Sequence, residues 1–532
     1  MKMKRIFSIC ITVVMLLASF AAAIPANAAL HKDFRYPVGA VYEALGEAGF
    51  AQGELTVSVN TWVNNNANGC PMDAVVYWAN ANGKLEGYSS LARFKLTTRA
   101  TTFAFPELQI IPEGADRLLV YTAQHGTDTL SSQSVEAMLP ENHDYIPSGD
   151  PLMSFIVLSD THVLSSDTAN ENIIFKDMLS DVREYFPDVE GIFINGDNAQ
   201  SNKTADSTSA LDTQLDKIES YRESICPDVP IFMGVGNHDL WPNDMFDAAK
   251  NVFLNAVTLP DGSHPTSLNY DFWLGGYHFV FLGDDDGAKP DPTYTKLSDE
   301  TLEWLDETLA EDYDAGKPTF VFLHQAISNT VAGSLTDFGQ EWDGVVNAIE
   351  VKRVLRKYPE AILFSGHSHY SMDSVGNAYP GGDIFPTAFN TASLSRAKIH
   401  YADGTTEDAG EAQGYVIEVY EDSVLVRGRD FKNDVWKASA QYMVDYSEDN
   451  NSGNSNNQSN NQSNNKEPSA TKPTQTTNTS TEASKTTDAS TSGTDATQAP
   501  TGCASSLSFT ATAVSATIAL GSALTFRKRK RD

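Results

Sequence analysis

Five short clusters of histidine, aspartate and asparagine recur between residues 160 and 369. Each one directly follows an apolar run, and together they hold five of the eleven histidines of the chain. They are Asp-Thr-His at 160–162, Gly-Asp-Asn at 196–198, Gly-Asn-His-Asp at 236–239, His324, and Gly-His-Ser-His at 366–369. Imidazole nitrogens with carboxylate and amide oxygens, and no thiolate, suit zinc, iron or manganese. These residue types therefore predict metal binding.

The apolar runs before the clusters predict the elements that position them. Phe155–Leu158 is typical of a buried strand, and Phe175, Met178, Leu179 and Val182 then recur at helical spacing before the next apolar run. This alternation repeats along the chain and predicts a layered α/β domain. Ligands in such sheets gather at the carboxyl ends of the strands, so five clusters behind five strands indicate one shared site. His278 lies inside an apolar run of its own and is assigned to structure.

The ordered set D-x-H, G-D, G-N-H-D, H and G-H-x-H resembles the motifs of the calcineurin-like metallophosphoesterase superfamily, over roughly residues 150 to 435. The resemblance implies a four-layer α/β/β/α fold with a dinuclear metal site at the strand ends. It implies that Asp160, His162 and His369 hold one metal, that Asn237, His324 and His367 hold the other, and that Asp197 bridges them. Two divalent or trivalent ions of manganese, iron or zinc are expected, with the choice among them open.

The reaction implied by this resemblance is hydrolysis of a phosphate ester by a hydroxide that bridges the two metals, without a covalent enzyme intermediate. His238 would be the catalytic histidine that is not a ligand, and it would protonate the leaving group. Gln200 and Ser201 stand where the protein phosphatases have Asp and Arg and the purple acid phosphatases a ligand Tyr. This departure weakens the phosphoprotein interpretation and gives no reason to expect a coloured ferric site.

Few residues are candidates for holding the substrate. Arg396 follows a predicted strand and could contact phosphate, and Asp284 to Asp286 could line the mouth of the site. An ordinary surface-loop role is an equal alternative for both. The formal net charge of −33 argues against a nucleic-acid polymer as partner, because binding such a backbone needs a basic surface. A small phosphate ester or nucleotide is compatible with that charge if bound cations reverse the local field.

The remaining segments predict the domain organisation. Period-two patterns with turn signals indicate a small all-β sandwich domain at 29–148, before the catalytic domain at 149–446. Residues 1–28 read as a signal peptide, and 447–502 contain no large apolar residue and read as a disordered stalk. Residues 503–526 form a charge-free stretch, either a retained membrane span or a cleaved sorting segment, before a basic tail at 527–532. Cys70 and Cys226 are too few for a disulfide framework.

This organisation predicts an extracellular enzyme anchored to the membrane or cell wall, with its oligomeric state open. The leading interpretation is a phosphoesterase for small esters or nucleotides. One alternative is a phosphodiesterase specific for a lipid or envelope polymer, which would prefer diesters. Another is a surface adhesin with a vestigial site, although a lapsed site should have lost at least one of its eight positions.

Overall fold

The computed structural model describes residues 37–44, 49–59, 72–98, 100–125, 127–140, 147, 149–284, 293–311, 314, 316–342, 344–382, 384–400 and 406–446. The predicted signal peptide, stalk, membrane or sorting segment and basic tail lie outside these residues, as do Cys70, Asp285 and Asp286. Among the described helices, none is both long and apolar enough to cross a bilayer.

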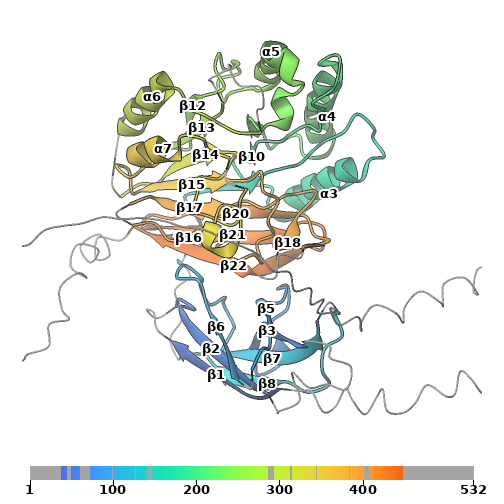
Figure 1. Cartoon of the computed structure of the whole chain (residues 1–532), viewed down its shortest axis with the longest axis vertical. Helices are drawn as coiled ribbons and strands as arrows, with labels where there is room; N and C mark the ends of the chain where they lie inside the picture. Colours follow the sequence, from blue (N-terminus) through green and yellow to red (C-terminus); the bar gives the residue numbers. More distant parts are fainter. Residues whose placement is uncertain are drawn as a thin grey trace, which may run out of the picture. The chain divides into compact units, whose positions relative to one another are not determined.

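The first six-stranded sheet follows the order β11-β10-β9-β20-β21-β22. Its strands β10, β20, β21 and β22 are labelled in Figure 1. Strands β9, β10 and β11 pair in parallel, because each is joined to the next through a helix, and β20 to β22 continue the sheet as an antiparallel meander. The sequence patterns at Tyr415–Tyr420 and Val424–Phe431 predict the β20–β21 hairpin, whereas β22 is not predicted. The elements are β9 Met153–Leu158, α3 Asn170–Tyr185, β10 Ile192–Asn195, α4 Ser209–Ile225, β11 Ile231–Gly234, β20 Gln413–Val419, β21 Ser423–Asp430 and β22 Val435–Asp445.

The second six-stranded sheet follows the order β12-β13-β14-β15-β17-β16. Its central strands β13, β14, β15 and β17 are parallel. The elements between β11 and β17 are the 3₁₀ turns η1 His238–Leu240, η2 Asn243–Met245 and η3 Thr336–Phe338, the helices α5 Phe246–Ala256, α6 Asp299–Ala310 and α7 Ala348–Leu355, and the strands β12 Tyr270–Leu274, β13 Tyr277–Leu282, β14 Thr319–Leu323, β15 Ala361–Ser365, β16 Ala378–Tyr379 and β17 Thr387–Asn390. The short hairpin β18 Lys398–His400 and β19 Thr406–Asp408 follows.

Alternating side chains explain why the two sheets pack face to face. In β13, Phe279 belongs to the core shared by the two sheets, whereas Val280 and Leu282 belong to the core under α6 and α7. The ring of Phe279 lies 4.5 Å from that of Phe193 in the first sheet and 5.3 Å from that of Phe155. Helix α3 contributes its apolar stripe to the shared core. The predicted mixed α/β fold is confirmed.

The N-terminal region is all-β, as predicted. Leu55 of β2 and Trp78 of β3 are buried in a core that both of its sheets supply. The three-stranded sheet has the order β1-β2-β6, and the five-stranded sheet has the order β4-β3-β7-β8 with β5 on β3. The strands are β1 Pro37–Ala44, β2 Gly53–Val59, β3 Met72–Asn80, β4 Gly83–Lys84, β5 Ala92–Lys95, β6 Ala100–Ala104, β7 Arg117–Gln124 and β8 Val135–Met138.

This region is tied to β22 by hydrogen bonds. The side chain of Gln109 donates to the carbonyl of Ala438 at 2.9 Å, and the N–H of Ile110 donates to the carbonyl of Gln441 at 2.9 Å.

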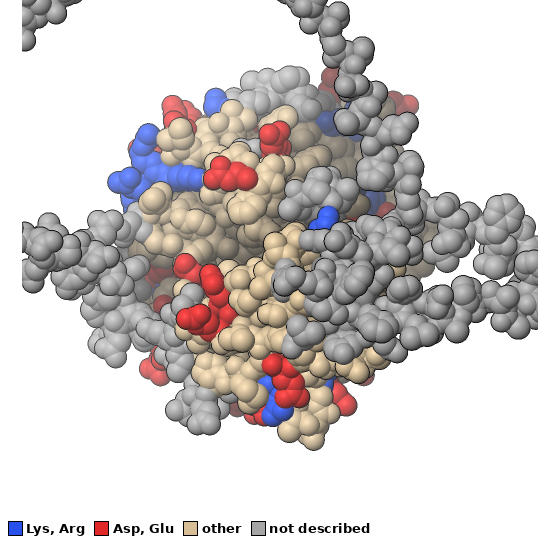
Figure 2. Space-filling view, turned by 60° about the horizontal axis from the view of Figure 1, so that its bottom comes forward, with Lys and Arg blue, Asp and Glu red and all other residues tan. Residues whose placement is uncertain are grey.

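Figure 2 shows acidic and basic side chains interspersed among a majority of uncharged ones on one face of the molecule.

Candidate metal centre

The seven predicted ligands meet at the carboxyl ends of the strands of both sheets. The donor atoms of six of them, all but Asn237, form two groups that can hold a metal ion. One group contains Asp160, His162, Asp197 and His369, and the other contains Asp197, His324 and His367. Asp197 therefore belongs to both groups, in the position that a bridging carboxylate requires.

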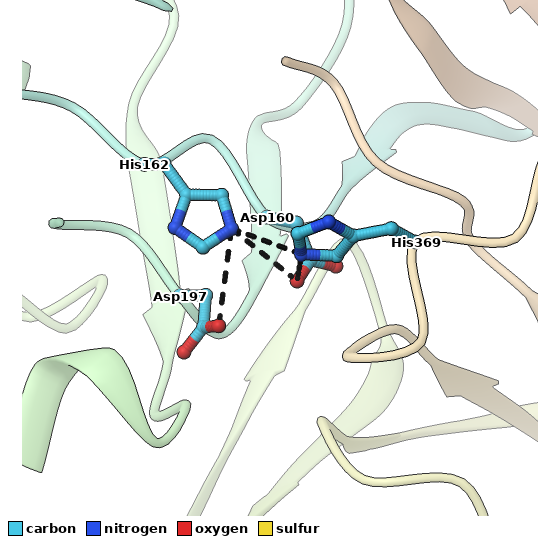
Figure 3. A group of neighbouring side chains, drawn as sticks. All are labelled: Asp160, His162, Asp197 and His369. Atoms are coloured by element: carbon cyan, nitrogen blue, oxygen red, sulfur yellow. Dashed lines mark hydrogen bonds and ion pairs between the residues drawn. The ribbon is translucent and has the colours of Figure 1, made fainter. Parts of the chain in front are cut away.

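The first group brings nitrogen atoms together at distances that call for a shared cation. The Nε2 atoms of His162 and His369 are 3.0 Å apart, and His369 Nε2 is 3.0 Å from Asp160 Oδ1 (Figure 3). Two imidazole lone pairs at this distance repel each other unless a proton or a metal lies between them. His162 and Asp160 are fully buried, so water does not relieve the repulsion.

The second group is oriented by the backbone. His324 Nδ1 donates to the carbonyl of Asn195 at 2.7 Å, which leaves the Nε2 lone pair directed at Asp197 Oδ2, 3.4 Å away. His367 Nδ1 lies 2.9 Å from Asn237 Oδ1, so the predicted amide ligand is also in place. Among the described residues, the buried atoms His324 Nε2 and Asp160 Oδ1 form no hydrogen bond, although Asp197 Oδ2 and His369 Nε2 lie 3.4 Å and 3.0 Å from them. Such orphaned donor atoms fit two metal ions.

The backbone at the ligands is strained. Asp160, His162, Asp197, His367 and His369 all have positive φ, between 48° and 65°. This left-handed region costs a residue with a side chain about 1–3 kcal/mol and persists where the surroundings enforce it, most often at functional sites.

Close backbone packing enforces this geometry. A Cβ added to Gly236 would lie 2.2 Å from the backbone nitrogen of Asp197, so only glycine lets the two loops meet. The carboxylate of Asp239 ties the same loops together: Oδ2 accepts from the N–H groups of Asn198 and Gly236, and Oδ1 from that of Ala199. Asp239 is thus a buried structural residue that holds the two loops together. Its position in the sequence cluster is equally compatible with a metal ligand, so only these hydrogen bonds reveal its structural role.

The charges of the site shift the pKa values of its residues in opposite directions. Burial lowers the pKa of His162 to about 3 and that of His367 to about 4, which keeps both imidazoles neutral and able to bind metal. Burial would also lower the pKa of His324, but the carboxylates of Asp197 and Asp160 outweigh it and raise that pKa to about 9. Burial would raise the pKa of Asp197, yet the neighbouring His324 and His238 hold it well below its usual value.

His238 lies beside both groups without joining either. Its N–H donates to Asp197 Oδ1 at 2.8 Å, and its Nε2 is 3.9 Å from Asp197 Oδ2. The imidazole ring of His238 lies 4.0 Å from the ring of Trp241. Burial lowers the pKa of His238.

The structure gives the other candidates specific partners. Arg396 donates to Gln200 Oε1 at 2.7 Å and to Glu171 Oε1 at 2.8 Å, so phosphate contact by Arg396 stays a prediction. Asp284 is buried, and its Oδ1 accepts from the N–H of Lys296 at 3.1 Å. His278 is buried, with its Nε2 2.8 Å from Asp271 Oδ2.

Comparison with known proteins identifies the catalytic region. Residues 153–371 match the family model described as calcineurin-like phosphoesterase. This part of the chain is a calcineurin-like phosphoesterase domain. The family is one of metal-dependent phosphoester hydrolases, as the sequence motifs predict.

The phosphoesterase domain also resembles individual proteins. The chain is 27% identical over 192 residues to purple acid phosphatase 23 of Arabidopsis thaliana, covering 34% of this chain and 38% of that protein. It therefore spans well under half the length of this curated relative. Among solved structures, a dimetal phosphatase from Danio rerio has a TM-score of 0.41 at 14% identity, covering 56% of this chain and 100% of that chain. A purple acid phosphatase from yellow lupin (Lupinus luteus) has 0.40 at 13%, covering 77% and 74%.

Removal of metal should make the stability of the domain depend on pH through His324. Its pKa is raised from 6.5 to about 9 in the folded protein without metal, so folding binds a proton between these values and stability falls as pH rises from 6.5 to 9. Bound metal needs a neutral imidazole and should abolish the slope. Thermal unfolding of chelator-treated and metal-loaded protein across this range tests this. The slope should disappear in stripped His324→Asn, and its persistence there would contradict the assignment.

Proposed function

We propose that this protein is a cell-surface phosphoesterase that hydrolyses small phosphate esters or nucleotides at a dinuclear metal site. The sharing of Asp197 by two ligand groups, with His238 beside them, carries this proposal. Asp160, His162 and His369 would hold one ion, Asn237, His324 and His367 the other, with Asp197 between them. Two such ions, when bound, lower the pKa of a shared water and neutralise the phosphate oxygens.

The residues of the chain provide the rest of the reaction. The site walls are buried, which excludes bulk water and strengthens each interaction with a charged substrate. His238 has its Nε2 on the side of Asp197 and is 16% exposed through its side chain, so an ester bound at the centre can reach it. We assign it the proton that the departing alkoxide needs.

A surface location belongs to the proposal because of the segments that flank the domains. A signal peptide at 1–28, a polar stalk at 447–502 and an apolar segment with a basic tail would display the catalytic domain outside the cell. Protease treatment of intact cells tests this: loss of the domain from the cell surface is expected, and full protection would contradict it.

The choice between monoesters and diesters is tested with metal-stripped protein given manganese, zinc or iron. Paired chromogenic phosphate mono- and diesters are the substrates. Metal-dependent turnover with monoester preference is expected. A strong diester preference would favour the alternative of a lipid or envelope-polymer diesterase. Metal retention without turnover on either ester would favour the alternative of a surface adhesin.

An exposed tryptophan at the site indicates how the organic part of the substrate is held. Trp342 is 53% exposed, and its ring lies 6.1 Å from that of His367. Its backbone N–H donates to the carbonyl of Gly333 at 2.7 Å, which fixes the loop, whereas most of its side chain faces solvent. An ordered, exposed aromatic ring beside a metal ligand is suited to stacking on an aryl or nucleobase group.

Trp342→Ala should therefore raise KM for 4-nitrophenyl and nucleoside phosphates about tenfold and leave kcat nearly unchanged, because stacking contributes about 1–3 kcal/mol. Glycerol phosphate should be unaffected. Trp273→Ala is the matched control, because Trp273 is also exposed and stacks on a histidine, His278, that is not a predicted ligand. An equal rise in KM for glycerol phosphate would contradict the stacking role.

A further inference from the structure

A chain of hydrogen bonds reaches His238 from the far side of the ring. Glu171, in the first turn of α3, accepts from Arg396 at 2.8 Å, and Arg396 donates to Gln200 Oε1 at 2.7 Å. The other end of the Gln200 amide, Nε2, lies 3.1 Å from His238 Nδ1. Arg396 and Glu171 are partly buried, with side chains 32% and 19% exposed.

The direction of this chain follows from the chemistry of arginine. A guanidinium only donates, so its neighbour on Gln200 must be the carbonyl oxygen, and the amide NH₂ must face His238. The NH₂ then donates to His238 Nδ1, which must carry a lone pair. The carbonyl of Ser201 also faces Nδ1, at the longer distance of 3.3 Å. The shorter contact, with its amide fixed by Arg396, places the imidazole proton on Nε2.

Nε2 is the atom that faces the metal centre, 3.9 Å from Asp197 Oδ2. This series of hydrogen bonds also connects to the loop that carries the predicted ligand Asp160. The N–H of Arg396 donates to Ser393 Oγ, and the hydroxyls of Ser393 and Ser395 both donate to the carbonyl of Asp160 at 3.0 Å. Arg396, Gln200 and the ligand loop of Asp160 therefore form one hydrogen-bonded unit.

We propose that Gln200 is a positioning residue that holds the Nε2–H of His238 toward the substrate, and that Arg396 acts through Gln200 instead of binding phosphate. This inference rests on the proposed function, because it concerns the group that His238 offers to the departing oxygen. A neutral ring that lost its Nε2 proton would become an anion, so the Nε2–H first acts as a hydrogen-bond donor to that oxygen. The ring takes up a second proton from solvent before it protonates the oxygen, and it is neutral again after the transfer. Gln200 lies at a position where the protein phosphatases and the purple acid phosphatases have other residues. In this protein its side-chain amide orients the imidazole ring by donating a hydrogen bond to Nδ1. Removing it should loosen the ring and free its tautomer while leaving the ligands in place.

The test uses full-length Gln200→Met and Arg396→Met, and their double variant, with 4-nitrophenyl phosphate and an alkyl phosphate as substrates. Arg427→Met is the matched control, because Arg427 pairs with Glu418 in the same way. A misplaced proton donor affects a poor leaving group most. In Gln200→Met, kcat for the alkyl ester should fall about 10- to 100-fold and that for the nitrophenyl ester less than about threefold, with KM and metal content unchanged.

Arg396→Met should show the same pattern, and the double variant should be no worse than Gln200→Met alone, because both act through one hydrogen bond. A rise in KM for both esters in Arg396→Met, with kcat intact, would overturn the proposal and make Arg396 a phosphate contact. Equal loss on both esters together with loss of metal would reduce Gln200 to a structural residue.

A second measurement does not depend on turnover. Nitrogen-15 spectra of histidine-labelled, zinc-loaded protein should show the His238 proton on Nε2 in the wild type and a mixture of tautomers in Gln200→Met. A proton on Nδ1 in the wild type would overturn the inference. Absence of wild-type hydrolysis with the expected tautomer present would instead count against the proposed function alone.

Discussion

Asp197→Ala should remove both metal ions and reduce kcat/KM by about 10⁴-fold or more, because two metals without a bridging carboxylate lose their common ligand and their shared water. Asp197 belongs to both ligand groups and also accepts the N–H of His238 through Oδ1. Under the proposed function, the substitution would therefore remove one ligand from each metal and one support from the proposed proton donor His238. Elemental analysis of the purified variant, together with its rates, measures both effects.

Asp271→Ala is the control for this change, because Asp271 pairs with a buried histidine, His278, that is not a predicted ligand. It should keep its metals and its activity. Retention of two metals and normal turnover in Asp197→Ala would refute the assignment of the bridging carboxylate.

His238→Ala should keep both metals and lose most turnover, with kcat lower by about 10²- to 10⁴-fold, the usual contribution of a positioned proton donor. KM should change little, because in the proposed function the metal centre, and not His238, holds the phosphate. His238 touches the centre through its backbone N–H, which the substitution retains, and its ring is not in either ligand group. Metal content and kcat measured on one preparation separate the two effects.

His264→Ala is the matched control, because His264 lies in a loop where Nδ1 contacts the carbonyl of Val257. No loss of activity is expected there. Loss of a metal from His238→Ala in proportion to its loss of activity would show that His238 is a ligand and not the proton donor.

The ligand clusters could be predicted because each one is local to the end of a strand. Asp160 and His162 come shortly after β9, and His367 and His369 come shortly after β15. The apolar run before each cluster predicts the strand, and the residues that follow the run are the candidate ligands. Parallel strands then bring their ends together whatever the length of chain between them. The mixed α/β fold follows from the same alternation of periods.

The hydrogen-bonded surroundings of the site could not be predicted in this way. Gln200 and Arg396 are 196 positions apart, and no local pattern states that their side chains meet. Similarly, the sequence places Asp239 in the same cluster as His238, and only the four hydrogen bonds to its carboxylate show that it fastens loops. Such contacts depend on loop geometry, which strand and helix periodicity leaves undetermined.

Strand β22 illustrates the same limit for the fold. It pairs with β21 through a register shift between Arg427 and Arg429, and it carries a buried lysine, Lys437, which donates to Asp373 and Glu411. A charged residue in a strand is typical of an exposed face, so the sequence gives no signal of this burial. The two carboxylates compensate the charge, a pairing that only the tertiary structure supplies.

The most direct test of the central claim is a metal titration of the full-length protein after chelation, followed by both metal content and phosphate-ester hydrolysis. Activity should be absent in the stripped protein and should rise until two ions are bound per chain, with zinc, manganese or iron. Full hydrolysis by the metal-free protein would contradict the account, as would saturation of activity at one ion with Asp197→Ala unaffected.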